Sequence, residues 1–257
     1  LTRRPQGERI GIICRGCESR AVRALVVEHQ HARDKLYVIG VPCHGILDQR
    51  KIERHMGENV IKAVDQGQEV IVTNRQGTQR FPRAELLHDS CARCLHPNPV
   101  GADVVLGEPL RTFASEGKRG LGAPVAEFEA QTPEARYAYF VQEAEACLRC
   151  YACREACPMC YCTECFVDHA TPRWTESMIT PAGTHAWHIV RAFHQTGRCV
   201  SCGACERACP MDIKMTYLTD KLNHDMQQLY GFEVGADEEA QPPFAALTLD
   251  DRQRFVR

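Results

Sequence analysis

The sequence predicts two folded parts, an α/β domain in residues 1–100 and an α+β domain rich in short helices and loops in residues 136–230. Near the amino terminus, apolar segments alternate with a helical pattern, as in an α/β unit. Residues 101–133 contain five glycines and three prolines with no sustained periodicity, which predicts a linker over residues 101–135. After it, short helical stretches alternate with cysteine clusters, and the acidic, Pro-containing segment 231–257 predicts an extended tail.

The amino-terminal elements follow from the apolar pattern. Arg9–Ile13 and Leu36–Val41 are apolar and predict two strands, and Ser19 can cap a helix that runs to about His31. These three elements form one β-α-β unit, in which the strands are parallel. The remaining predicted elements are a helix over Gly45–His55 and strands over Val60–Val64 and Glu69–Thr73 around a turn.

Sixteen cysteines in 257 residues are far more than an ordinary globular chain contains. A chain of this length can bury a core without disulfides, and the cysteines occur in C-x2-C pairs, so they predict bound metal. The 33 acidic and 31 basic residues, a formal charge of -2, argue against a nucleic-acid-binding protein. No apolar run is long enough to span a bilayer and no signal-like segment opens the chain, which predicts a cytoplasmic protein, although the start at Leu1 leaves room for a removed leader.

Two cysteine motifs in the second domain carry the strongest prediction. Cys147, Cys150, Cys153 and Cys157 precede Pro158 in the pattern C-x2-C-x2-C-x3-C-P, and Cys199, Cys202, Cys205 and Cys209 precede Pro210 in the same pattern. In this pattern three thiolates bind one 4Fe-4S cubane and the fourth binds the other. The predicted ligand sets are therefore Cys147, Cys150, Cys153 and Cys209 for the first centre, and Cys199, Cys202, Cys205 and Cys157 for the second. Zinc is the alternative, but zinc sites rarely use this triple spacing. The domain resembles a bacterial two-cluster ferredoxin with a longer insert.

The insert between the two motifs holds three further cysteines, Cys160, Cys162 and Cys165. They can begin a fourth cluster, completed by a distant cysteine or by His169, or they can be free thiols packed beside a cubane. A helix over about Thr184–Gln195 places Trp187, Val190 and Arg191 on one face. We expect this face to pack in a core or an interface and not to bind metal.

Five cysteines remain in the first domain. Cys17 follows the first predicted strand and Cys43 the second, so in a parallel unit both lie at the same sheet edge. Cys91 and Cys94 can complete a third cubane with them. The alternative is a zinc ribbon of Cys14, Cys17, Cys91 and Cys94, which leaves Cys43 as a buried thiol.

Four segments are similar to the iron-sulfur beta subunits of formate dehydrogenases and of deazaflavin (coenzyme F420)-reducing hydrogenases. They are Gly11–Arg20, Gly40–Cys43, Cys91–Cys94 and Cys147–Cys165. The resemblance implies ligands at Cys17, Cys43, Cys91 and Cys94 but not at Cys14. It also implies a subunit that carries electrons between a molybdenum or tungsten formate dehydrogenase, or a hydrogenase, and a flavin or heterodisulfide-reductase-like partner. Larger members bind FAD, but this chain has no G-x-G-x-x-G fingerprint, so an FAD site is not expected.

The sequence thus predicts an electron-transfer subunit of an anaerobic redox complex. At least two 4Fe-4S clusters are predicted in the second domain and a third in the first domain, and the insert cysteines could bind a fourth. No nucleophile with its base, P-loop or H-E-x-x-H helix is recognisable, so we expect no catalysis by the chain alone. Two alternatives remain open. One is a flavoprotein that itself reduces a soluble carrier such as a deazaflavin, and the other is a zinc-stabilised interaction module.

Overall fold

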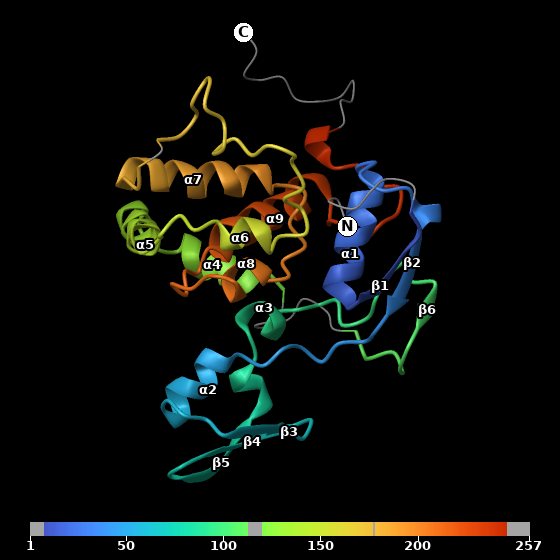
Figure 1. Ribbon diagram of the computed structural model, residues 1–257, viewed down its shortest axis with the longest axis vertical. Helices are drawn as coiled ribbons and strands as arrows, with labels where there is room; N and C mark the ends of the chain where they lie inside the picture. The colour runs from blue at the N-terminus through green and yellow to red at the C-terminus, as the bar shows by residue number, and fades with distance from the viewer. Residues whose placement is uncertain (1–7, 113–119, 177, 246–257) are drawn as a thin grey trace.

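The computed structural model describes residues 8–112, 120–176 and 178–245 (Figure 1). Within these ranges the strands form two separate three-stranded sheets, in the orders β1-β2-β6 and β3-β4-β5. The strands are β1 Ile10–Cys14, β2 Leu36–Gly40, β3 Lys62–Asp65, β4 Glu69–Asn74, β5 Gly77–Pro82 and β6 Val104–Val105. The α-helices are α1 Gly16–Val27, α2 Gln49–Met56, α3 Asp89–Ala92, α4 Gly122–Glu129, α5 Pro133–Glu145, α6 Ala152–Glu155, α7 Pro181–His194, α8 Ala204–Arg207 and α9 Thr216–Tyr230. The short 3-10 helices are η1 Arg33–Lys35, η2 Arg83–Leu86 and η3 Pro243–Ala245.

The predicted β-α-β unit is confirmed. Strand β1 pairs in parallel with β2, with Ile10 opposite Leu36, and α1 connects them. Helix α1 begins three residues before Ser19, because the Glu18 carboxylate accepts a hydrogen bond from the Arg15 N–H (2.8 Å) and caps the first turn. It also ends earlier than predicted, before His29, whose φ of 57° cannot continue a helix.

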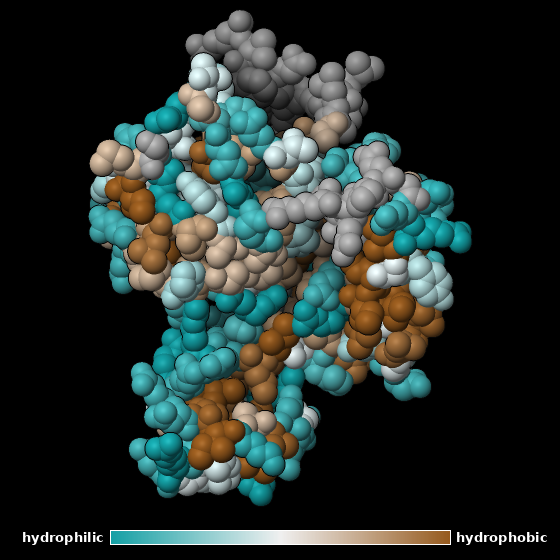
Figure 2. Space-filling model, in the orientation of Figure 1, coloured by the Kyte–Doolittle hydropathy of each residue, from teal (hydrophilic) through white to brown (hydrophobic). Residues whose placement is uncertain are grey.

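One face of the parallel sheet packs against α1 and the other is exposed. Side chains alternate between the two faces of a strand, so Ile10, Ile12 and Cys14 point toward α1. Ile13 and Tyr37 point the other way and are 68% and 54% exposed. In Figure 2 apolar side chains gather over the region of β1, β2 and β6. Parallel sheets are usually covered on both faces, so it is unusual that no described element covers this one.

The second sheet forms a small module with α2 and η2, set apart from the helical half in Figure 1. Its core consists of Ile52, Met56, Val70, Val72 and Leu86. Both predicted strands are present as β3 and β4, and the predicted helix is present as α2, which begins at Gln49 because Asp48 caps it. Strand β5 was not predicted, because all but one of its residues are exposed and its sequence carries no apolar alternation.

The segment 101–135, which lacks sustained periodicity in the sequence, nevertheless contains regular elements. Strand β6 extends the parallel sheet by pairing with β2, and α4 packs against α9. The two-residue length of β6 and the glycine and proline at the start of α4 explain why no periodicity was visible. The assignment of this segment to a linker between domains stays a prediction.

The predicted insert helix is present as α7. Trp187 is 1% exposed and Arg191 is 6% exposed, so this face packs in the interior as expected. Trp187 lies in a core with Cys153, Cys209, Ile213 and Met215. Among the described residues, no helix is both long and apolar enough to cross a membrane.

The described part of the predicted tail is packed, which corrects the expectation of an extended segment. Phe232 and Val234 are buried in a core with Ala21, Ala24 and Leu25 of α1. The buried Arg20 guanidinium donates two hydrogen bonds to the Val234 carbonyl oxygen (2.9 and 2.7 Å). The apolar alternation of Phe232 and Val234 is too short to be recognised in an acidic segment. Residues 246–257 lie outside the described residues.

Truncation after Gly231 is therefore expected to unfold the chain or lose metal, because it removes Phe232 and Val234 from the core on α1. The single change Phe232→Ala is expected to lower the free energy of unfolding by about 3 kcal/mol, the usual cost of emptying a buried aromatic site. Phe244→Ala is the control, because Phe244 is 66% exposed, and it is expected to cost much less unfolding free energy. An equal loss in Phe232→Ala and Phe244→Ala would contradict the buried position of Phe232.

Candidate metal centres

The first candidate centre gathers the four thiols that the crossed motif predicts. Cys147, Cys153 and Cys209 pack in one core, and Cys150 lies exposed on the same loop. Burial raises the pKa of the Cys147 thiol, and the neighbouring Cys209 and Cys150 add to the rise. Cys209 therefore lies with the first motif, although it is 62 residues from Cys147 in the sequence.

The second candidate centre has the reciprocal arrangement. Burial raises the pKa of the Cys202 thiol to about 11, with further contributions from Cys199 and Cys157. Burial also raises the pKa of the Cys205 thiol, where Cys199 and Cys202 are again among the neighbours. Cys157 of the first motif thus lies with the loop of the second. The structure brings together both crossed sets of four.

The two motifs fold into the same loop because their sequences are repeats. Arg149 and Ser201 have φ values of 49° and 52°, and two residues later Tyr151 and Gly203 have φ values of 61° and 68°. These left-handed conformations turn the backbone N–H groups toward the sulfur atoms. The Arg149 N–H donates to Cys147 Sγ (3.3 Å) and the Ser201 N–H donates to Cys199 Sγ (3.4 Å).

The third candidate centre lies between the parallel sheet and α3. Cys17 is in the first turn of α1, Cys43 follows β2, and Cys91 and Cys94 come from α3 and the residues just after it. All four line one cavity of about 420 Å³. Burial raises the pKa of the Cys94 thiol, and Cys91 and Cys43 add to the rise. The loops after the two parallel strands meet here, as the strand order predicts.

Backbone donors again point at these sulfur atoms. The Gly45 N–H donates to Cys43 Sγ and the His96 N–H donates to Cys94 Sγ, both at 3.3 Å. Such N–H to sulfur bonds stabilise the anionic thiolate that a metal ligand must be. With the bonds to Cys147 and Cys199, all three centres contain this feature. Four neighbouring thiols, with an N–H donor to one or two of the sulfur atoms, fit the four-thiolate coordination of a 4Fe-4S cubane.

Cys14 lies apart from the third centre. It is 0% exposed and packs with Val22, Leu36 and Val38 beneath α1. Burial raises the pKa of its thiol to about 11, and Glu18 adds to the rise. Because the strand alternation points Cys14 into this core, it does not line the cavity that holds the other four thiols.

The three insert cysteines take different positions. Cys160 lies beside Cys157, and the Gln195 side-chain amide donates to Cys160 Sγ (3.4 Å). Cys165 is half-buried against the core of the first centre, whereas Cys162 is exposed. His169 is half-exposed and lies 3.9 Å from the Glu164 carboxylate. The structure therefore places Cys160 near the second centre and Cys165 near the first.

The second and third centres are neighbours. Burial raises the pKa of the Cys17 thiol to about 12. The largest further contribution to this rise comes from Cys202 of the second centre, and Glu18 and Cys94 contribute less. Cys202 also lines the cavity of the third centre. An ion pair between Arg93 Nη2 and Asp220 Oδ2 (2.6 Å) connects the Cys91–Cys94 loop to α9.

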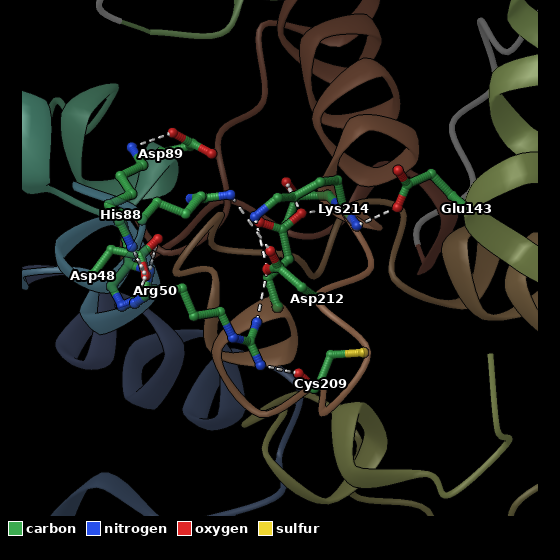
Figure 3. Close-up of polar contacts among 12 residues, drawn as sticks. Asp48, Arg50, His88, Asp89, Glu143, Cys209, Asp212 and Lys214 are labelled. Carbon is green, nitrogen blue, oxygen red and sulfur yellow. Dashed lines mark hydrogen bonds and ion pairs between the residues drawn. The ribbon is translucent and has the colours of Figure 1, made fainter. Parts of the chain in front are cut away.

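Residues outside the cysteine motifs also hold the centres in place. Arg50 of α2 donates to the Cys209 carbonyl oxygen and forms an ion pair with Asp212 (2.7 Å). Lys214 Nζ contacts the same Asp212 oxygen (2.9 Å), while its backbone N–H donates to Glu143 (2.7 Å) (Figure 3). Sequence reasoning missed these contacts, because Arg50 and Asp212 are 162 residues apart and nothing local marks them as partners.

Sequence comparison relates two parts of the chain to known families. Residues 7–121, which include the four thiols of the third centre, match the sequence model of a family described as the C terminus of the coenzyme F420 hydrogenase/dehydrogenase beta subunit. Residues 143–213 match the 4Fe-4S dicluster domain and include both crossed motifs. The resemblance expected from the sequence is thereby confirmed, and the chain contains multiple 4Fe-4S clusters.

Two curated relatives match nearly the whole chain. One is the F420-dependent formate dehydrogenase subunit beta of Methanocaldococcus jannaschii, 25% identical over 292 aligned residues. The other is the F420-dependent formate dehydrogenase 1 subunit beta of Methanococcus maripaludis, 24% identical over 296 aligned residues. Each alignment covers 92% of this chain and 76% of the relative.

Proposed function

We propose that this iron-sulfur protein, which joins an F420 hydrogenase/dehydrogenase beta-subunit segment to a 4Fe-4S dicluster domain, relays electrons through three cubanes. The ligands are Cys147, Cys150, Cys153 and Cys209 for the first, Cys199, Cys202, Cys205 and Cys157 for the second, and Cys17, Cys43, Cys91 and Cys94 for the third. The electrons pass between a catalytic formate dehydrogenase subunit and a flavin or heterodisulfide-reductase-like partner. A hydrogenase is the alternative catalytic subunit.

The observation that carries this proposal is the adjacency of the three groups of thiols. Cys153 of the first centre and Cys157 and Cys205 of the second all raise the pKa of the same buried side chain, Arg191, so thiols of both centres lie near it. Cys202 of the second centre lines the cavity of the third. Electron tunnelling slows steeply with distance. Because neighbouring centres have lining residues in common, electrons can pass from one centre to the next.

The exposed thiol of Cys150 supports an exchange of electrons at the first centre. At the other end, the described residues that line the cavity of the third centre include four arginines and no acidic side chain, namely Arg15, Arg83, Arg111 and Arg207. Arg15 is paired with Glu18 and Arg83 with Asp65, and no ion pair of Arg111 or Arg207 is present among the described residues. Positive charge around a four-thiolate cubane offsets its net negative charge and helps to set its potential. The first and third centres are thus the proposed ends of the relay.

The partner assignment follows the names of the relatives, which are formate dehydrogenase subunits. The chain contributes ligands, N–H donors and spacing, and we propose no bond-making chemistry within it. A second candidate function is a flavoprotein that itself reduces a deazaflavin. The observation in support of this second candidate is that the names of both relatives mention F420.

The isolated chain, purified without oxygen, is expected to contain about twelve irons and to be catalytically inert. Assays with formate, hydrogen, nicotinamide and deazaflavin carriers test this, and adding a formate dehydrogenase catalytic subunit is expected to restore electron flow. Turnover of any of these by the chain alone, with bound flavin, would favour the flavoprotein. Colourless protein with zinc in place of iron would support an interaction module instead.

A further inference from the structure

Helix α7 places a buried arginine between the first and second centres. Arg191 is 6% exposed, and its Nη2 donates to the backbone carbonyl oxygen of Cys153 (3.3 Å), a ligand of the first centre. Burial lowers its pKa, but the thiols of Cys205, Cys153 and Cys157 outweigh this effect and raise it. The guanidinium is therefore bonded to the backbone of a first-centre ligand and lies near enough to second-centre thiols for their charge to act on it.

No carboxylate within the described residues forms an ion pair with Arg191, and its buried Nε has no hydrogen-bond partner there. Among the described residues, its Nη1 has a hydrogen bond to the Met215 sulfur atom (3.8 Å). Arg20, which is equally buried, shows the usual solution, because it pairs with Glu233 (3.1 Å) and bonds to the Val234 carbonyl. A buried charge without a counter-charge is strongly destabilising, so Arg191 requires an anion that no carboxylate of the described residues supplies.

The next turn of the same helix also faces sulfur. The Gln195 amide Nε2 donates to Cys160 Sγ (3.4 Å), and its Oε1 accepts from Cys157 Sγ (3.5 Å). Gln195 lies four residues after Arg191, on the same face of the helix. One face of α7 thus presents a cation and an amide to the two centres, although it lies in the insert between their motifs.

We propose that Arg191 is the shared counter-charge of the first and second cubanes and that it raises the reduction potential of both. This inference rests on the proposed function, in which both centres hold 4Fe-4S clusters. A four-thiolate cubane is anionic and becomes more so when it accepts an electron, so a nearby cation stabilises the reduced form more than the oxidised form. Burial keeps this attraction from being screened by water and salt.

The test compares Arg191→Met, Arg191→Gln and Arg191→Lys in the full chain, purified without oxygen. Midpoint potentials of both clusters are measured by a dithionite titration followed by electron paramagnetic resonance. In the neutral variants the equilibrium constant for one-electron reduction of each cluster is expected to fall about tenfold. This corresponds to a midpoint potential lower by about 59 mV. Arg191→Lys is expected to stay within about threefold of the parent.

The matched control is Arg33→Met, because Arg33 is an exposed arginine paired with Asp103 (2.8 Å) in the first domain. It removes the same charge and is expected to leave both potentials unchanged. Neutral variants that keep all their iron and the parental potentials would overturn the inference, as would an equal shift in Arg191→Lys. If both neutral variants lose clusters while Arg191→Lys keeps them, the result would support the inference. If all three variants lose clusters, Arg191 has a purely structural role and the inference is overturned. A parent chain without iron would instead refute the proposed function.

Discussion

Replacing Cys43 by Ala is expected to remove one whole cluster, about four irons per chain, whereas replacing Cys14 by Ala is expected to leave the iron content unchanged. Cys43 lines the cavity with the three other thiols of the third centre and receives the Gly45 N–H, but Cys14 points into the core beneath α1. Iron and sulfide analysis of both variants is the measurement.

Cys14→Ala is a stringent control because it removes a fully buried thiol. It is expected to cost about 1 kcal/mol of unfolding free energy, since a small cavity remains under α1. The opposite pattern, iron lost with Cys14→Ala and kept with Cys43→Ala, would favour a ribbon of Cys14, Cys17, Cys91 and Cys94. Metal analysis of the same samples for zinc distinguishes the two arrangements.

Replacing Cys209 by Ala is expected to abolish the first cluster, although Cys209 belongs to the second motif. In the folded chain its thiol lies in one core with Cys147 and Cys153, far along the sequence from both. Cys205→Ala changes a thiol only four residues away and is expected to abolish the second cluster instead. Each variant is thus expected to lose about four irons, from different centres.

Electron paramagnetic resonance of the reduced variants makes this comparison. The spectrum of Cys209→Ala is expected to match that of Cys147→Ala, and the spectrum of Cys205→Ala is expected to match that of Cys199→Ala. If Cys205→Ala and Cys209→Ala lose the same signal, the ligands do not cross between motifs. Crossed ligation would keep the two cubanes adjacent, which the proposed relay requires.

Much of the candidate site was predictable because ligand spacing is a local property. A C-x2-C-x2-C loop brings three thiols together within one or two turns of chain, whatever the rest of the protein does. The β-α-β unit was predictable for a similar reason, since the apolar periods of β1, α1 and β2 lie within 31 residues. These local patterns also located Cys17 and Cys43 at one sheet edge.

Other features carried no local pattern and were missed or wrong. Strand β5 is polar and exposed, and it is a strand only because β4 offers it hydrogen-bonding groups. The packing of Phe232 and Val234 depends on α1, which lies about 210 residues earlier in the chain. The α4 helix begins with glycine and proline and is stabilised by its packing on α9.

By itself the sequence determined the chemistry of this protein, which is many thiols in cubane spacing on a chain with no recognisable catalytic residues. Only the tertiary structure decided that the three groups of thiols are neighbours, from Cys150 at the surface to the cavity around Cys43, which Cys202 also lines. It also decided that Arg191, an ordinary helical arginine in the sequence, is buried between two of them. The physical reason is that covalent spacing specifies contacts over a few residues, whereas burial and charge pairing depend on segments that meet only when the whole chain has folded.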